Sequence, residues 1–162
     1  MTSDRIPRRG GHPAATPSGF RDERDGTATH PSATWEFSRS HAGAVRRAVA
    51  EYASHRGLEG MRRSDFVLAV YEGMTNAIRY GGGRGRVRLW TCDGLLNCEV
   101  ADHGPGIPVT ALTGDDLPPD GEPGRRGLWL IRNLSESCRF TTGPEGTTIR
   151  ITFRLTGQPP AM

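Results

Sequence analysis

The dipeptide Asp93-Gly94 constrains the fold of this chain more than any other short feature of the sequence. An Asp-Gly pair between two segments of alternating apolar and polar residues is typical of a two-residue β-hairpin turn. Folding the chain at this turn aligns the flanking strands. The residues that face each other across the two strands are then Thr91 with Leu96, Leu89 with Cys98, and Val87 with Val100. These six side chains share one face, while Arg88 and Glu99 form a pair of opposite charge on the other. The sequence therefore predicts antiparallel strands with one buried face, on which Cys98 is a core residue rather than a reactive thiol.

Two helices are predicted before the hairpin. Ser40 can cap the first helix, which runs to about Arg56 and ends at Gly57. The second helix begins after Ser64, runs to about Tyr80 and ends at three consecutive glycines. Its apolar residues recur at three- and four-residue spacing, which indicates a buried stripe made of Val67, Val70, Met74 and Ile78.

Short strands are predicted on both sides of these elements. One strand covers residues 35–37, and two more, at 138–142 and 147–155, follow a helix that begins at Gly127. The last strand alternates apolar and polar side chains, as in a sheet covered on one side only. Residues 104–126 show no such pattern, and a connection longer than about 12–15 residues is usually a lid or a disordered insert.

Composition and charge exclude several classes of protein. All 21 basic residues are arginines, which are scattered and nearly balanced by 18 acidic residues, and this argues against direct binding of nucleic acid. The three cysteines lack metal-ligand spacing, and their odd number is typical of reduced thiols in the cytoplasm. No apolar run has the length of a signal or membrane-spanning segment. Residues 1–33 carry few large apolar side chains and are predicted to be a disordered tail, with residues 157–162 as a short C-terminal tail.

A first candidate site lies on the second predicted helix. Glu72 and Asn76 are four residues apart and therefore project from one face of the helix, with Arg79 nearby. A carboxylate and an amide oxygen together can hold Mg²⁺ or orient a hydroxyl group. The ordinary polar face of an amphipathic helix accounts for the same residues, so this motif alone leaves both interpretations open.

A second candidate site is the glycine-containing loop after the hairpin. Gly104 and Gly106 allow the backbone to turn tightly beside a flat ligand, and Ile107 follows them. Asp102 can accept a hydrogen bond from an exocyclic amine such as that of adenine. Alternatively, Asp102 can cap its own loop as an Asx turn.

A third candidate site is the start of the helix at Gly127 and Leu128. Free backbone N–H groups at a helix N-terminus attract anions, and Gly127 lets a phosphate approach closely. Arg125 and Arg126 are natural supplementary cations. The alternative is a glycine hinge with solvated arginines.

The order of these motifs resembles the GHKL (histidine-kinase-like) ATPase superfamily. A Glu-x-x-x-Asn-Ala helix precedes an Asp-x-Gly-x-Gly loop, and a Gly-Leu helix start precedes a final strand that opens with Gly146-Thr147-Thr148. The resemblance implies an α+β class and a two-layer Bergerat ATP-binding fold over residues 34–156. In that fold a mixed, mostly antiparallel sheet is covered on one face by helices.

The resemblance also implies ATP and Mg²⁺ as cofactors and a role for each motif. Asn76 would ligate Mg²⁺, and Asp102 would accept a hydrogen bond from the adenine amine. Glu72 would act as the general base or polarise the attacking hydroxyl. Residues 108–126 would form a lid over the nucleotide. The other positions around the nucleotide would be Arg79, Gly104, Gly106, Ile107, Arg125, Gly127, Leu128, and either Thr147 or Thr148.

Within the superfamily, the short domain is similar to the anti-sigma-factor serine/threonine kinases. The shared features are an opening strand with an arginine-bearing helix and the string Gly-Leu-Trp-Leu-Ile-Arg after the lid. This similarity implies that the protein sequesters a sigma factor and phosphorylates a serine on a STAS-type anti-anti-sigma partner. Anti-sigma kinases of this type are often homodimers, so the similarity is also compatible with a homodimer. The chain departs from the pattern at Arg126, where many relatives have a small residue, and at Tyr80, where these kinases commonly have histidine.

Two other functions fit the same motifs. One is a non-catalytic module that binds ATP and sequesters a sigma factor or another regulator. The other is the catalytic half of a two-component histidine kinase, with His41 as phosphoacceptor. No acidic residue directly follows His41 and no helical hairpin is predicted before it, which argues against the histidine kinase.

Overall fold

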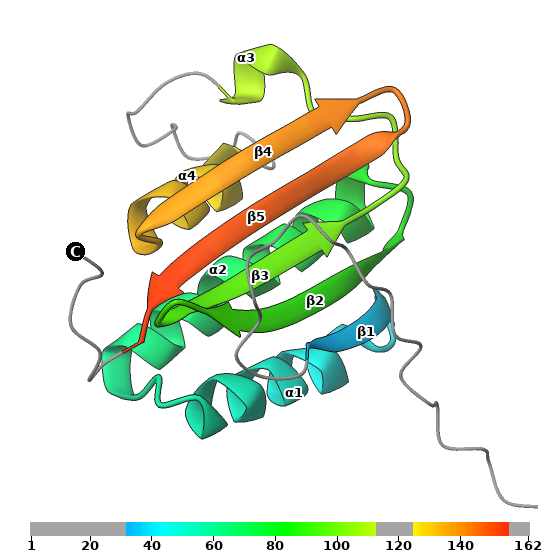
Figure 1. The fold of residues 1–162 in the computed structure, drawn as a ribbon. Helices are drawn as coiled ribbons and strands as arrows, with labels where there is room; N and C mark the ends of the chain where they lie inside the picture. The colour runs from blue at the N-terminus through cyan, green and yellow to red at the C-terminus, as the bar shows by residue number, and fades with distance from the viewer. Residues whose placement is uncertain (1–31, 113–124, 156–162) are drawn as a thin grey trace, which may run out of the picture.

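The computed structural model describes residues 32–112 and 125–155 as one sheet with helices against it (Figure 1). The elements in chain order are β1 (Ala33–Ser38), α1 (Ala42–His55), α2 (Gly60–Tyr80), β2 (Arg84–Cys92), β3 (Leu95–Ala101), α3 (Val109–Leu112), α4 (Arg125–Leu134), β4 (Ser137–Gly143) and β5 (Gly146–Arg154). The sheet order is β1-β2-β3-β5-β4. The predicted α+β class and the two-layer arrangement are confirmed. The four strand pairs among the described residues are all antiparallel, so the expected parallel component is not seen there.

The central hairpin has the predicted register. Val87 pairs with Val100, and Arg88 pairs with Glu99. Asp93 and Gly94 both have positive φ angles, of 50° and 75°, as a turn of the type I′ class requires. Because a two-residue turn leaves no freedom of register, this local signal was sufficient to align both strands.

Helix α2 begins at Gly60, four residues before Ser64, after which the helix was predicted to start. Glu59 at its N-cap makes no side-chain capping bond. The first turn is instead fixed by Arg62, whose guanidinium donates hydrogen bonds to the Glu136 carboxylate and to the Arg154 carbonyl oxygen. These partners are distant in sequence, so no local signal marks the start.

The ends of three other elements also differ from the predictions. Helix α1 has His41 rather than Ser40 at its N-cap, and the Ser40 hydroxyl bonds the His41 ring instead of capping the helix. Helix α4 starts at Arg125 instead of Gly127, and β5 ends at Arg154. The predicted stretch without regular structure, 104–126, therefore contains the helical residues Val109–Leu112 and the start of α4 at Arg125. Residues 113–124 and most of the predicted tails lie outside the described residues.

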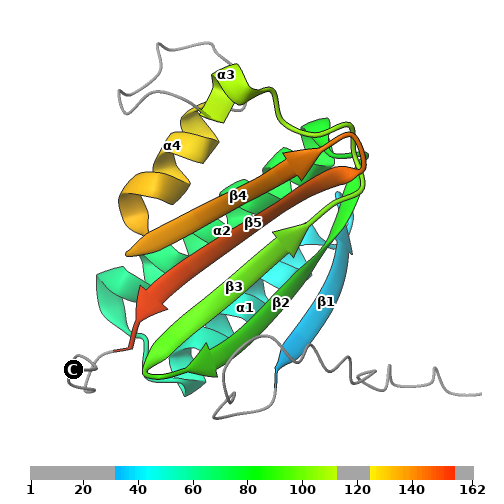
Figure 2. The same ribbon diagram turned by 45° about the horizontal axis from the view of Figure 1, so that its top comes forward.

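The core lies between one face of the sheet and the helices. Figure 2 shows α1 and α2 behind the strands and α4 beside the β4 edge. Phe66 of α2 and Phe153 of β5 are fully buried and meet edge to face, with ring centroids 5.2 Å apart. The predicted alternation of β5 is confirmed, since Ile149 and Ile151 are buried while Arg154 is exposed.

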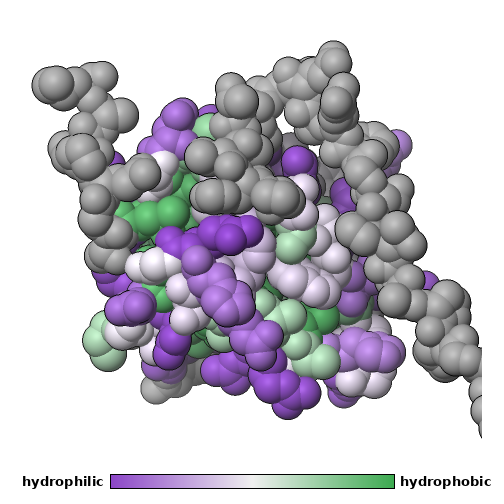
Figure 3. Space-filling view, turned by 60° about the horizontal axis from the view of Figure 1, so that its bottom comes forward, coloured by the Kyte–Doolittle hydropathy of each residue, from purple (hydrophilic) through white to green (hydrophobic). Residues whose placement is uncertain are grey.

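The side of the molecule nearest α1 presents mainly hydrophilic surface (Figure 3).

Within residues 32–112 and 125–155, no helix combines the length and apolar composition of a bilayer-spanning segment.

Candidate functional site

Glu72 and Asn76 lie on the same face of α2, one helical turn apart. The Asn76 side chain is only 9 % exposed, and it makes no hydrogen bond to another residue of the described part. Glu72 is half-buried, and Arg79 is exposed near the end of the helix. The Asn76 amide has one acceptor oxygen and two N–H donors, so it keeps hydrogen-bonding capacity for a ligand.

The first turn of α4 packs directly on Glu72. A Cβ atom on Gly127 would lie 2.6 Å from Oε2 of Glu72, so only glycine allows this approach without moving the carboxylate. The N–H groups in the first turn of a helix carry partial positive charge. Arg125 is half-buried and Arg126 is exposed in the same turn. Leu128 differs from its neighbours, since its side chain is buried in the core.

Asp102 follows β3, and its two carboxylate oxygens have different neighbours. Oδ1 accepts the N–H of Gly104 at 2.9 Å and the N–H of Thr147 at 3.2 Å, so the Asx turn of the alternative interpretation is present. Oδ2 lies against Gly81 at the end of α2, where an added Cβ would collide with it. Oδ2 has no hydrogen-bond partner among the described residues, although Asp102 is only 9 % exposed. One oxygen therefore holds the loop and the other is available as an acceptor.

The loop after Asp102 is anchored to the β4–β5 hairpin. Gly106 has a φ of +89°, and a Cβ there would press on the Gly143 backbone. The N–H of Ile107 donates to Oγ1 of Thr142 at 2.7 Å, and this hydroxyl is 3.0 Å from the hydroxyl of Thr147. These contacts close the loop against β5.

The structure separates the two candidate threonines. Thr147 is buried, and its N–H donates to the Asp102 carboxylate. Thr148 points to the opposite face of the sheet, where it pairs with Ala101 and Thr141. Thr147 therefore lies beside Asp102, and Thr148 does not.

The candidate residues thus gather around the C-terminal half of α2. Glu72 meets Gly127, and about two and a half turns further along, at the C-cap of the helix, Gly81 meets Asp102 and Gly104. Sequence reasoning missed Gly81 and Thr142 as parts of this site. The triple glycine was interpreted only as a helix stop, and Thr142 carries no motif of its own.

A comparison with protein families gives this arrangement its context. The sequence pattern of the histidine kinase-like ATPase domain matches residues 36–153, which is most of the chain. The chain belongs to this family. As a histidine kinase-like ATPase domain, the chain has a fold that binds ATP, and Asp102 and Asn76 are buried groups with the chemistry to meet an adenine amine and a Mg²⁺ ion.

Two solved structures are similar to this chain. The RsbU and RsbW domains of Rv1364c from Mycobacterium tuberculosis match with a TM-score of 0.59 and 22 % identity, covering 78 % of this chain and 33 % of that one. A histidine kinase domain from Erythrobacter litoralis EL346 matches with a TM-score of 0.48 and 25 % identity, covering 72 % and 66 %. The histidine kinase-like ATPase chain thus spans about a third of the mycobacterial chain. A search of curated proteins gave no match.

The described residues fit a metal that is held jointly with a nucleotide. They contain no cluster of three or more acidic, histidine or cysteine side chains that could hold a metal ion alone. Mg²⁺ keeps most of its ligands as water and phosphate oxygens and needs only one or two from the protein. The Asn76 amide oxygen is suited to supply one of them.

Proposed function

We propose that this chain is a cytoplasmic ATP-binding regulatory protein with serine/threonine kinase activity. It sequesters a sigma factor and phosphorylates a serine on a STAS-type anti-anti-sigma partner. The observation that carries this proposal is the position of Glu72, whose carboxylate lies beside the N-terminal turn of α4 and one turn from Asn76. The motifs shared with the anti-sigma kinases support the choice of substrate.

Phosphoryl transfer requires mainly positioning and neutralisation of charge. In this site Asp102 Oδ2 would accept the adenine amine, and the Asn76 amide would hold Mg²⁺, which neutralises phosphate charge when bound. Arg79, Arg125 and the N-terminal N–H groups of α4 would add positive charge around the phosphates. Glu72 would accept the proton of the attacking serine hydroxyl and orient its oxygen toward the γ-phosphorus.

The same position of Glu72 also supports a second candidate, a module that binds ATP without transferring phosphate. A carboxylate beside a helix N-terminus stabilises the helix through its dipole, typically by about 0.3–1 kcal/mol. Glu72 would then have a structural role only, and sequestration of the regulator would depend on nucleotide binding alone.

The variant Glu72→Gln separates the two candidates because it keeps the shape of the side chain and removes the base. We expect phosphate transfer from labelled ATP to purified candidate STAS-type proteins to fall at least about 100-fold, as for loss of a general base. Binding of a non-hydrolysable ATP analogue, measured by calorimetry, should change little.

Glu51→Gln is the matched control, since Glu51 is exposed on α1 and should leave transfer unchanged. Unchanged transfer in Glu72→Gln would remove Glu72 from the mechanism. If the wild-type chain binds nucleotide and a sigma factor but transfers no phosphate, the binding module is the correct function.

A further inference from the structure

The face of the sheet that points away from the helices carries more arginines than carboxylates. Strand alternation and register place the outward side chains, and the charged ones are Glu36, Arg84, Arg86, Arg88, Glu99, Arg139, Arg150 and Arg154. Six arginines against two glutamates leave four positive charges in excess on this outer face. The whole chain has a net charge of only +3, so the rest of the molecule is close to balanced.

Part of this charge is without a partner in the described residues. Glu99 is paired, since Arg150 lies 3.3 Å from its carboxylate. Arg84, Arg86 and Arg139 are exposed, and their side chains make no ion pair or hydrogen bond to any residue within 32–112 or 125–155. Because like charges crowded on one surface repel each other, an acidic ligand would relieve an existing cost.

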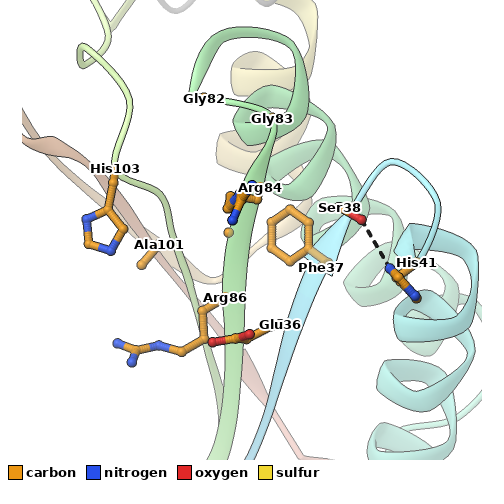
Figure 4. A pocket seen from close by; sticks show the side chains of 11 residues that line it. Glu36, Phe37, Ser38, His41, Gly82, Gly83, Arg84, Arg86, Ala101 and His103 are labelled. Carbon is orange, nitrogen blue, oxygen red and sulfur yellow. Dashed lines mark hydrogen bonds between the residues drawn. The ribbon is translucent and has the colours of Figure 1, made fainter.

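An open pocket of about 700 Å³ lies at one end of the outer face. Figure 4 shows Arg84 and Arg86 of β2, Glu36 of β1 and His103 after β3 around it. His41 lies on its other side, where its ring bonds the Ser38 hydroxyl at 3.1 Å. The pocket is a concave part of the charged face that can accommodate one side chain of a ligand.

The chemistry of the outer face favours an acidic polypeptide over a nucleic acid. Single-stranded nucleic acids are bound by exposed aromatic rings on which bases stack. Within the described strands, Trp90 is the one aromatic residue that points to this face, and it is only 3 % exposed. The guanidinium groups of Arg88 and Arg150 lie over its ring at 4.9 and 5.2 Å, so the ring is already occupied.

A second copy of the chain does not suit the outer face either. Two such faces brought together would oppose six arginines with six arginines, and juxtaposed like charges are costly at an interface. We propose that the outer face of the sheet docks an acidic segment of a partner protein, with a carboxylate of that segment in the pocket beside Arg84 and Arg86.

The test uses the full chain without nucleotide, so its outcome is independent of the kinase proposal. A fluorescein-labelled oligoglutamate peptide is titrated with the protein and followed by fluorescence anisotropy, with an oligoglutamine peptide as the neutral control. Arg86→Glu, next to the pocket, and Arg139→Glu, at the far edge of the sheet, should each weaken oligoglutamate binding. We expect a loss of about ten-fold for Arg86→Glu and a smaller loss for Arg139→Glu.

Arg47→Glu is the matched control, because it changes net charge equally from an exposed position on α1, in the helical layer. It should bind oligoglutamate within about two-fold of the wild type. An equal loss in Arg47→Glu would show that binding follows net charge alone and would overturn the proposal. Binding of oligothymidylate as tightly as the peptide would also overturn the proposal. So would self-association of the chain in ultracentrifugation that Arg86→Glu abolishes.

Discussion

The Asp102 carboxylate uses Oδ1 to hold two backbone N–H groups and leaves Oδ2 without a partner among the described residues. Replacing Asp102 with asparagine can preserve the oxygen that holds the loop while placing an NH₂ group next to Gly81. An NH₂ group donates hydrogen bonds and cannot accept one from an adenine amine. The two tasks of this residue are therefore separable by replacing one carboxylate oxygen with an NH₂ group.

We expect Asp102→Asn to weaken adenine-nucleotide binding by about ten- to 100-fold, because a buried donor is left unsatisfied in the complex. Its far-UV circular dichroism should match that of the wild type. Titration with a fluorescent ATP analogue measures the affinity. Asp93→Asn makes the same chemical change at the hairpin turn, where asparagine is favoured, and should bind normally. Wild-type affinity in Asp102→Asn would exclude this residue from adenine recognition.

The sequence predicted best those residues whose neighbours are fixed by local geometry. The register around Asp93-Gly94 and the shared face of Glu72 and Asn76 follow from one turn and one helical period. The choice between Thr147 and Thr148 was not accessible in this way. It depends on the pairing of β5 with β3, which lie about fifty residues apart in the chain, and on the bond to Asp102.

Helix α2 shows the same limit in its first turn. Its middle was predicted from periodicity, but its start depends on Arg62, whose partners Glu136 and Arg154 lie 74 and 92 residues away. The early turn has an energetic role, because it brings Phe66 into the core against Phe153. This aromatic contact joins the start of α2 to the last strand of the sheet.

We expect Phe66→Ala to lower the free energy of unfolding by about 3–5 kcal/mol, through lost burial and the cavity left behind. Chemical denaturation followed by circular dichroism measures this change. Met61→Ala, one turn earlier in the same helix, is the control, since Met61 is 77 % exposed and should change stability by less than about 0.5 kcal/mol. Equal losses in the two variants would mean that the start of α2 does not pack as described.

The stability of the folded domain should fall at alkaline pH. Burial raises the pKa of the Cys98 thiol well above its ordinary value, and the nearby Glu99 carboxylate raises it further. Above the ordinary thiol pKa the unfolded chain loses this proton while the folded protein keeps it, so unfolding becomes easier as pH rises. The chain has no lysine, which leaves few other groups that titrate in this range.

We expect the free energy of unfolding to decrease by up to about 1.4 kcal/mol per pH unit from Cys98 once the pH exceeds the ordinary thiol pKa. Denaturation curves from neutral to alkaline pH measure this slope. Cys98→Ala should show a shallower slope, whatever its stability at neutral pH. Identical slopes in the two proteins would show that the Cys98 thiol titrates alike in the folded and unfolded chain.

At the end of β3, consecutive residues of the chain belong to the outer pocket and to the candidate nucleotide site. Ala101 and His103 line the outer pocket, while Asp102 between them turns its carboxylate toward Gly81 and Thr147. A ligand in the pocket that moves Ala101 or His103 therefore also moves Asp102, because a single peptide bond joins each of them to Asp102. Thermodynamic reciprocity then requires that if an acidic peptide changes the affinity for adenine nucleotide by some factor, the nucleotide changes the affinity for that peptide by the same factor.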